Sequence, residues 1–577
     1  MITLSKPLAP HVIDVSKPDV ELRLKLEPAQ EPLQHKLGRK AKTSLRYERK
    51  MGDSELSYFL PSRQAGVNDM YLHIGFSARP ECMQQARVRA AWAILRLRHP
   101  LLAARAETCD GLWDDVRFVY DAPSSPEAAF RAAEDGLLFR MGSKEDLLEE
   151  YLNGPRTLSN TRLSCLFVSE VLIAPEQTPG ALREYNLIIS AAHFIGDGMS
   201  AHMLAHDLFS LLSGAAHEDA LLERLKEEWS VRWAGTPRES ETILPLALEE
   251  SMLPSGPMSR LHAITARVDF ELSEVRVVGG QIFPRRAAPA AASSLPNQTA
   301  RQTTYTFEFS PERTRAILTS CKSNRASVNS ALFAICAAAW ARFNSSGDRV
   351  STFDAGTPTL MYSARSLRPP SATATAKDPD ARGGSYFSLA LGYFTVGLPS
   401  FLPADADVAQ AKAFWHRARA ARAQCARAAA HPLTASRTRE MARSRSERAQ
   451  AFARMDDAAT SLLPHPPPPT ADVNLASLLP ARGPASSAAL LGLSLPGNLD
   501  ALYARAYPPS PTGDEVEIRP HTLTQGARLR KRGALLMAFT FQGQLRLCLG
   551  WDGEAFAEGV VEGFWAEILT CMSEFMG

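Results

Sequence analysis

The sequence predicts an α/β (α+β) fold in two domains that mix strands and helices. A strand-length apolar run is followed by a tight loop and a helix in the first half, and a two-strand hairpin signal lies near the end. No fixed repeat period is present. At 577 residues, the chain is nearly four times a common domain length of about 150. Its hydrophobic content of 45% and charged content of 22% are typical of a chain that buries large cores.

Composition and charge exclude several classes of function. The 64 basic and 62 acidic side chains leave a net charge of +2, which argues against nucleic acid as a partner. No apolar stretch reaches the roughly 18 residues of a membrane span, so we expect no membrane insertion. The eight cysteines form no C-x-x-C pair, so neither a zinc site nor a disulfide framework is indicated. The first residues lack the pattern of a secretory signal, and we expect a cytoplasmic protein.

The first half presents one helix and one strand–loop–helix unit. Polar, proline-dotted residues 1–51 are expected to form an N-terminal arm, followed by an N-terminal domain over residues 52–280. Apolar residues at helical spacing predict a helix within residues 80–101. Residues 185–192 have the length and composition of a buried strand, and residues 199–212 show helical spacing before Gly214.

The second half is expected to begin after a crossover linker, residues 281–300, and to fill residues 301–577. Alternating Tyr305, Phe307 and Phe309 predict a half-buried strand, and an apolar helix follows from Val328. The remaining expected segments are two proline-rich insertions (367–385 and 463–470), an Ala- and Arg-rich basic segment (412–454), a hairpin turning at Gln542-Gly543 and a closing helix (556–575).

The loop between the first strand and its helix carries the chemistry. It reads Ala192-His193-Phe194-Ile195-Gly196-Asp197-Gly198. A histidine suits general-base catalysis because its ordinary pKa of about 6.5 lies near neutral pH. The glycines allow a tight turn, and Asp197 can accept a hydrogen bond or pair with a cation. His193 is therefore the candidate base, with Asp197 fixing the loop.

This H-x-x-x-D-G pattern after a strand resembles the CoA-dependent acyltransferase superfamily. That superfamily includes chloramphenicol acetyltransferase, plant acyltransferases, condensation domains of non-ribosomal peptide synthetases and fungal trichothecene O-acetyltransferases. Further segments fit the resemblance, which extends over most of the chain from Gly52 and is nearest to the stand-alone fungal enzymes: Gly52-Asp53-Ser54-Glu55, residues 89–101, Ala326-Ser327-Val328-Asn329, Met361-Tyr362-Ser363-Ala364-Arg365, Gly392-Tyr393-Phe394 and Gly550-Trp551-Asp552.

The resemblance implies two chloramphenicol-acetyltransferase-like domains, each a mixed sheet flanked by helices, with an active-site tunnel at their interface. His193 and Asp197 would be the catalytic pair, with His193 as general base and Asp197 as the structural acid. Gly198 would support the loop, and Arg365 would pair with Asp197. The expected reaction is transfer of an acyl group, by default acetyl, from acyl-CoA to a hydroxyl of a small secondary metabolite. We expect a monomer, with acyl-CoA as co-substrate and no permanently bound cofactor or metal; the residues that bind CoA are not assigned.

Two departures bear on the choice within the superfamily. Ala192 stands where condensation domains usually have a second histidine, and the plant D-F-G-W-G motif is absent. A condensation-type ester or amide synthase using a carrier-bound thioester stays an alternative. A catalytically inactive relative that binds small molecules is another.

Three other patterns have both a functional and a plainer structural interpretation. His202 and His206 lie four apart on the predicted helix, but Met203 replaces the glutamate of H-E-x-x-H and no third ligand is evident. The run Gly198 to His202 lacks the closing glycine of a nucleophile elbow. The Arg-rich segment 412–454 could contact CoA phosphates or an acidic partner, or form a solvated helix face.

Overall fold

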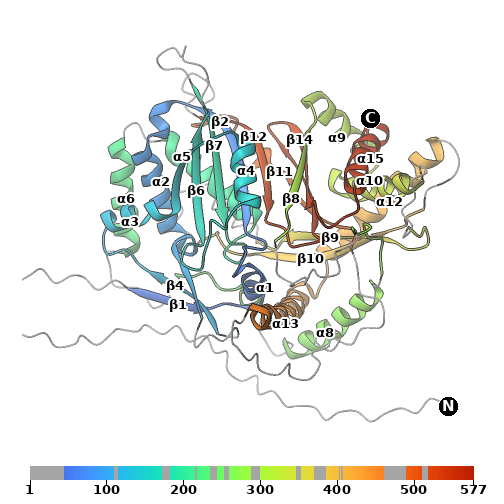
Figure 1. Cartoon of the computed structure of the whole chain (residues 1–577), viewed down its shortest axis with the longest axis horizontal. Coiled ribbons are helices and arrows are strands. Elements are labelled where there is room, and N and C mark those ends of the chain that lie inside the picture. Colours follow the sequence, from blue (N-terminus) through green and yellow to red (C-terminus); the bar gives the residue numbers. More distant parts are fainter. Residues whose placement is uncertain are drawn as a thin grey trace, which may run out of the picture.

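The computed structural model describes most of the chain from residue 45 onward: residues 45–108, 113, 115–171, 182–214, 218–233, 243–252, 259–277, 279–286, 299–345, 353–368, 385–401, 403, 407–460, 489–509 and 518–577. Two mixed sheets stand beside one another, each with helices against it, and a small third sheet lies below the first (Figure 1). The predicted α/β class is confirmed. Nearly all of both proline-rich insertions falls outside the described residues.

The first large sheet has the strand order β12-β2-β7-β6-β5. Only β5 and β6 run parallel; the other neighbours are antiparallel. Its central strands are buried along nearly their whole length, as expected for a sheet that is covered on both faces. The strand bounds are β2 (Met70–Ala78), β5 (Leu137–Met141), β6 (Ser164–Glu170), β7 (Arg183–Ala191) and β12 (Ile518–Ala527).

The small sheet corrects the expected N-terminal arm. Strand β1 (Arg46–Lys50) pairs with β4 (Val116–Asp121), and β4 pairs with β3 (Arg105–Thr108). The alternation places Tyr47 and Arg49 inward, where Arg49 forms an ion pair of 2.7 Å with Glu55. Residues 46–50 are therefore part of the folded body, because a buried charge pair and a ladder hold them.

Helices α2, α5 and α6 lie together on the side of the first sheet that faces away from the second sheet (Figure 1). The helix predicted within residues 80–101 is α2, and its ends are tight 3₁₀ turns, η1 (Pro80–Met83) and η2 (Pro100–Ala103), because a proline opens each. The helices of this half are α1 (Asp53–Ser62), α2 (Gln85–Arg98), α3 (Pro126–Ala132), α4 (Lys144–Asn153), α5 (Gly198–Gly214), α6 (Glu218–Trp233), α7 (Leu248–Ser251) and α8 (Ser259–Arg276), with the turn η3 (Glu134–Gly136).

The second large sheet has the order β10-β9-β11-β13-β14-β8. β9, β11 and β13 are parallel neighbours, and the outer pairs are antiparallel. The predicted hairpin is confirmed as β13–β14, with Gln542 (φ 55°) and Gly543 (φ 75°) both left-handed, as a two-residue hairpin turn requires. The strands are β8 (Gln302–Glu308), β9 (Thr359–Ser366), β10 (Leu391–Leu398), β11 (Leu491–Asn498), β13 (Ala534–Phe541) and β14 (Gln544–Asp552).

Helix α10 is the buried centre of the second half, packed against α12 and α15. Among the described residues, no single helix is long and apolar enough to cross a membrane; α9 and α10 together pass that test but meet at 93°. The helices are α9 (Pro311–Ser323), α10 (Val328–Ser345), α12 (Asp407–Ala429), α13 (Thr434–Thr460) and α15 (Val560–Phe575), with the turn η4 (Leu499–Ala501).

The expected linker contributes to this second core. Phe283, from the first part of residues 281–300, is 2% exposed and contacts the rings of Trp340 and Phe564 at 5.1 and 5.2 Å. The side chain of Gln281 is also held, because its Nε2 donates to the carbonyl of Thr357 at 2.9 Å. The described start of this segment is thus packed structure.

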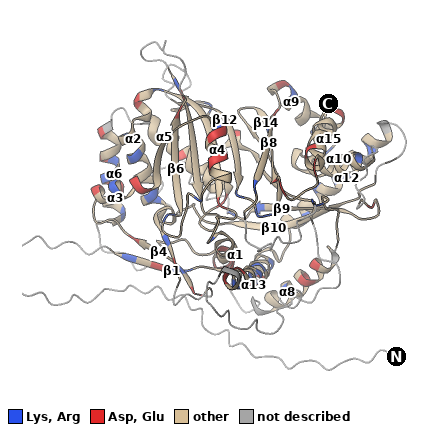
Figure 2. Cartoon of the chain, in the orientation of Figure 1, with Lys and Arg blue, Asp and Glu red and all other residues tan. Residues whose placement is uncertain are grey.

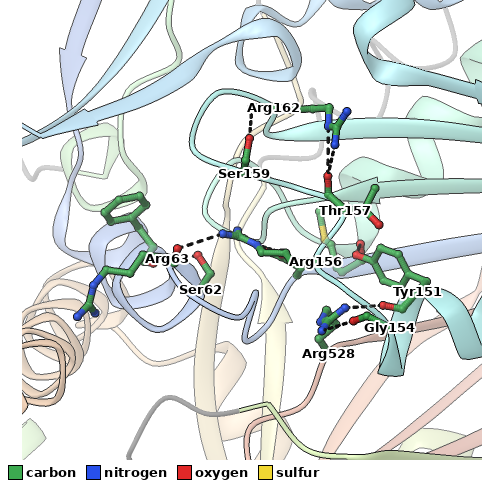
Figure 3. A network of polar contacts seen from close by, with 12 residues as sticks. Ser62, Arg63, Tyr151, Gly154, Arg156, Thr157, Ser159, Arg162 and Arg528 are labelled. Carbon is green, nitrogen blue, oxygen red and sulfur yellow. Dashed lines mark hydrogen bonds and ion pairs between the residues drawn. The ribbon is translucent and has the colours of Figure 1, made fainter. Parts of the chain in front are cut away.

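The two halves are joined by strand exchange. β12 comes from the C-terminal half but pairs with β2 of the first sheet. Just after β12, Arg528 donates to the carbonyls of Tyr151 (2.7 Å) and Gly154 (3.0 Å), while Arg156 donates to the carbonyl of Arg63 at 3.4 Å (Figure 3). The first sheet therefore contains strands from both sides of the domain boundary that was expected near residue 300.

Candidate active site

His193 lies in the loop between β7 and α5, at the junction of the two halves. Its ring is half-buried, and its Nδ1 lies 3.0 Å from the carbonyl oxygen of Gly196. A carbonyl only accepts, so Nδ1 must carry the proton in this bond. In the neutral ring this leaves the lone pair on Nε2, which is the atom free to take a proton from a substrate.

The surroundings keep this imidazole neutral. Burial lowers the pKa of His193 below its ordinary value, and the nearby Arg445 lowers it further, while Asp197 and the Gly196 carbonyl act in the opposite direction. The net shift is downward. A neutral histidine with one nitrogen fixed and the other available is suited to general-base catalysis near neutral pH.

One face of the His193 ring is covered by Tyr58 from α1. The two rings are stacked, with centroids 4.2 Å apart and an angle of 22° between their planes. The Tyr58 hydroxyl contacts the hydroxyl of Tyr393 on β10, and Tyr393 stacks on Tyr362 of β9 at 5.3 Å. Both halves of the chain therefore supply aromatic side chains beside the candidate base.

Asp197 is fully buried and braces the loop. Its carboxylate accepts from Arg368 Nη1 (2.7 and 2.6 Å), from the Ala390 backbone N–H (3.0 Å) and from the Ser200 N–H (3.2 Å). Arg368 also donates to the Ser388 carbonyl. The Asp197 carboxylate thus ties the loop to the C-terminal half, which is a positioning role.

The expected partner of Asp197, Arg365, was wrong. Arg365 donates to the carbonyl of Ala428 at 2.9 Å, at the end of α12. Arg368, three residues later and just past the end of β9, reaches Asp197 instead. The strand holds Arg365 in its ladder opposite Gly392, whereas the chain beyond the strand can turn toward the loop.

The two glycines of the loop differ in their surroundings. A Cβ on Gly196 would lie 2.6 Å from Phe387 Cε1 and 2.8 Å from Ser200 Oγ, so only glycine fits there without movement. A Cβ on Gly198 would meet only Gln525 Oε1, at 3.7 Å, and Gly198 is exposed at the start of α5. Packing therefore explains the glycine at 196 and leaves open space beside Gly198.

The other histidines of α5 have protein partners. His202 contacts the Tyr503 hydroxyl (3.0 Å) and Gln525 Oε1 (2.9 Å), and burial lowers its pKa to about 4. His206 contacts the Tyr507 hydroxyl at 2.7 Å. Within the described residues, no group of three or more histidine, cysteine or carboxylate side chains is arranged to hold a metal ion. The pair at four-residue spacing anchors the C-terminal half onto α5.

Comparison with solved structures places this arrangement in a known fold. A trichothecene 15-O-acetyltransferase (TRI3) from Fusarium sporotrichioides superposes with a TM-score of 0.64 at 12% identity, over 92% of this chain and 95% of that one. The chain has the chloramphenicol-acetyltransferase-like fold. An epimerization domain of tyrocidine synthetase B and the first condensation domain of the calcium-dependent antibiotic synthetase share it, each with a TM-score of 0.52 at 11% identity over 92% of this chain and 97% of theirs. No protein-family model and no curated protein sequence matches.

Several residues of the site were missed by the sequence interpretation. Tyr362 and Tyr393 lie inside segments that carried the resemblance, but nothing in their local pattern indicated that they meet. Arg445 lies in the basic segment 412–454, the second part of which is α13 (Figure 2). No acidic residue stands three or four positions from Arg445 on the helix, and this was the available signal. Tyr58 and Arg368 carried no distinguishing pattern.

Proposed function

We propose that the chain is an acyl-CoA-dependent O-acyltransferase, most simply an acetyltransferase, acting on a hydroxyl of a small secondary metabolite. The observation that carries the proposal is the neutral His193 whose Nδ1 is tied to Gly196, in a loop braced across the two halves by Asp197 and Arg368. The fold, shared with acyltransferases and condensation enzymes, supports it. The absence of a second histidine at Ala192 favours transfer to a hydroxyl over condensation.

The mechanism follows from the free nitrogen of His193. Nε2 takes the proton of the acceptor hydroxyl as its oxygen attacks the thioester carbonyl. The tetrahedral intermediate collapses with cleavage of the C–S bond, and the departing thiolate takes the proton back from His193 to give free CoA. The products are the ester and the thiol. No metal is required, because the thioester already supplies an activated carbonyl. We expect the two substrates to reach His193 through opposite mouths of a tunnel between the halves.

One copy of the chain supplies all the named residues of the proposed site. Tyr58 and His193 come from the N-terminal half, and Arg368, Tyr362 and Tyr393 come from the C-terminal half. Since both sides belong to one chain, a monomer in the cytoplasm suffices for the proposed reaction.

The test is release of free thiol from acetyl-CoA, with and without a pool of hydroxylated metabolites. We expect acceptor-dependent release by the wild type and its loss in His193→Ala. Release that requires a thioester on a carrier protein would support the condensation alternative. Ligand binding without turnover from either donor, with longer acyl-CoAs also tried, would instead indicate a binding protein.

A further inference from the structure

A guanidinium lies beside the candidate base in a cage of tyrosines. Arg445 of α13 places its Cζ 4.2 Å from the ring centroid of Tyr393 and 5.0 Å from that of Tyr58, and its Nη1 donates to the Tyr362 hydroxyl at 3.2 Å. Tyr58 in turn stacks on His193 at 4.2 Å. The ring of Tyr58 therefore contacts both the Arg445 guanidinium and the His193 imidazole.

Arg445 differs from three other enclosed arginines of the molecule, and also from Arg528, whose guanidinium donates to two backbone carbonyls. Arg49, Arg156 and Arg368 each meet a carboxylate within 2.8 Å: Glu55, Asp69 and Asp197, respectively. In the part of the chain that the structure describes, the contacts of Arg445 are tyrosines, and no carboxylate pairs with it. Burial alone would lower its pKa, but the three tyrosines raise it, so it stays charged. A half-buried cation without an anion is costly unless a ligand supplies one.

Other cations strengthen the positive potential at this place. Arg448, one turn along α13, and Arg530, after β12, lie close enough for Arg445 and Arg448 to lower the pKa of Arg530. Asp456 acts on Arg530 in the opposite direction. Asp197, the carboxylate of the His193 loop, is already neutralised by Arg368. Glu274 acts on Tyr362, the phenol that accepts from Arg445. Among the described residues no carboxylate is paired with the Arg445 guanidinium itself, which leaves it able to bind an anion.

The phosphates of CoA do not fit as that anion. A thioester held at His193 places the phosphates a whole pantetheine arm away, whereas Arg445 is separated from His193 by a single ring. A short anionic group on the acceptor itself fits the spacing. A guanidinium fork matches both carboxylate and phosphate, and carboxylate, the smaller of the two groups, suits this short spacing.

We propose that the acceptor is a hydroxy acid, whose carboxylate binds Arg445 with the Tyr362 hydroxyl alongside while its hydroxyl faces His193. The inference rests on the proposed function for the role of the hydroxyl. Its binding part stands on the geometry of Arg445 alone.

The experiment compares hydroxy acids with their own methyl esters. A panel of aliphatic and aromatic hydroxy acids, each paired with its ester, is supplied with acetyl-CoA to the wild type, Arg445→Gln, Arg445→Lys and Arg443→Gln, and thiol release is followed. Arg443 is the matched control, because it is 45% exposed on the same helix and paired with Glu440 at 2.6 Å. We expect the acid of a productive pair to be preferred in kcat/KM by at least about tenfold. Arg445→Gln should remove the preference through KM, Arg445→Lys should keep part of it, and Arg443→Gln should keep it all.

A binding measurement separates this inference from the proposed function. Calorimetric titration of the same acids into His193→Ala should show binding that Arg445→Gln lacks. Acetylation of esters or neutral alcohols in preference to acids would overturn the inference and leave the acyltransferase proposal standing. Binding of acids through Arg445 without thiol release would support the inference about the carboxylate and contradict the acyltransferase proposal. Equal loss of kcat toward acids and esters in Arg445→Gln, or no acid binding at all, would also overturn it.

Discussion

At the scale of single residues, the site depends on a few groups whose positions are fixed by partners rather than by their own sequence neighbourhood. His193 owes its tautomer to one carbonyl, Gly196. The loop around it is held by Asp197, whose carboxylate accepts from one guanidinium and two backbone N–H groups. From these contacts we predict different effects of substitution at residues of the same type that lie close together in the sequence.

Arg368 and Arg365 should behave differently when replaced. Arg368→Met leaves Asp197 buried without its cation, which we expect to cost about 3–5 kcal/mol of unfolding free energy and to lower kcat by displacing the His193 loop. Arg365→Met removes one bond to a backbone carbonyl and should cost about 1 kcal/mol. Urea unfolding of both variants measures the difference, and equal costs would show that Asp197 does not depend on Arg368.

Gly196 and Gly198 are a second pair of residues that should respond differently to substitution. Gly196→Ala must displace Phe387 or Ser200, so we expect a loss of about 1–3 kcal/mol. Gly198→Ala has room at the helix start and should leave stability within about 0.5 kcal/mol of the wild type. A Gly198→Ala protein that melts normally but turns over slowly would locate the substrate beside Gly198. Equal destabilisation by both changes would contradict the packing described.

At the scale of elements, the pairing of β12 with β2 of the first sheet joins the two halves, and His202 of α5 reports on it. Its two ring nitrogens contact Gln525 of β12 and Tyr503 after η4, and burial lowers its pKa to about 4. The unfolded chain, with an ordinary histidine pKa of about 6.5, binds this proton more readily than the folded one. The contribution of His202 is therefore complete above pH 6.5 and is lost as the pH falls toward 4.

The predicted size of this effect is about 2 kcal/mol between pH 7 and pH 5. His202→Gln cannot titrate, so the stability difference between wild type and variant should shrink by that amount over this range. Asp69 and Asp207, whose pKa values burial raises to about 6, act in the opposite direction but are common to both proteins. Unfolding in urea at the two pH values gives the difference. A pH-independent difference would mean that His202 is not held neutral.

At the scale of the whole molecule, much of the architecture was predictable because it depends on local pattern. The strand before His193, the helix after it and the β13–β14 hairpin follow from apolar runs, glycine positions and the Gln542-Gly543 turn. The crossing of β12 was not predictable, because its residues pair with β2 more than 400 positions earlier in the chain. Arg368 and Arg445 were missed for the same reason, since their partners are far away in sequence.

We propose that His193 acts as a neutral general base at the junction of the two halves. The most direct test is the pH dependence of kcat/KM for acceptor-dependent thiol release from acetyl-CoA. Because burial lowers the pKa of His193, activity should be full at pH 7 and fall only as the pH drops below the ordinary histidine value of about 6.5. His193→Ala should lose about 10²–10⁴-fold at every pH. A midpoint above pH 7, or a variant that keeps its acceptor-dependent release, would contradict the account.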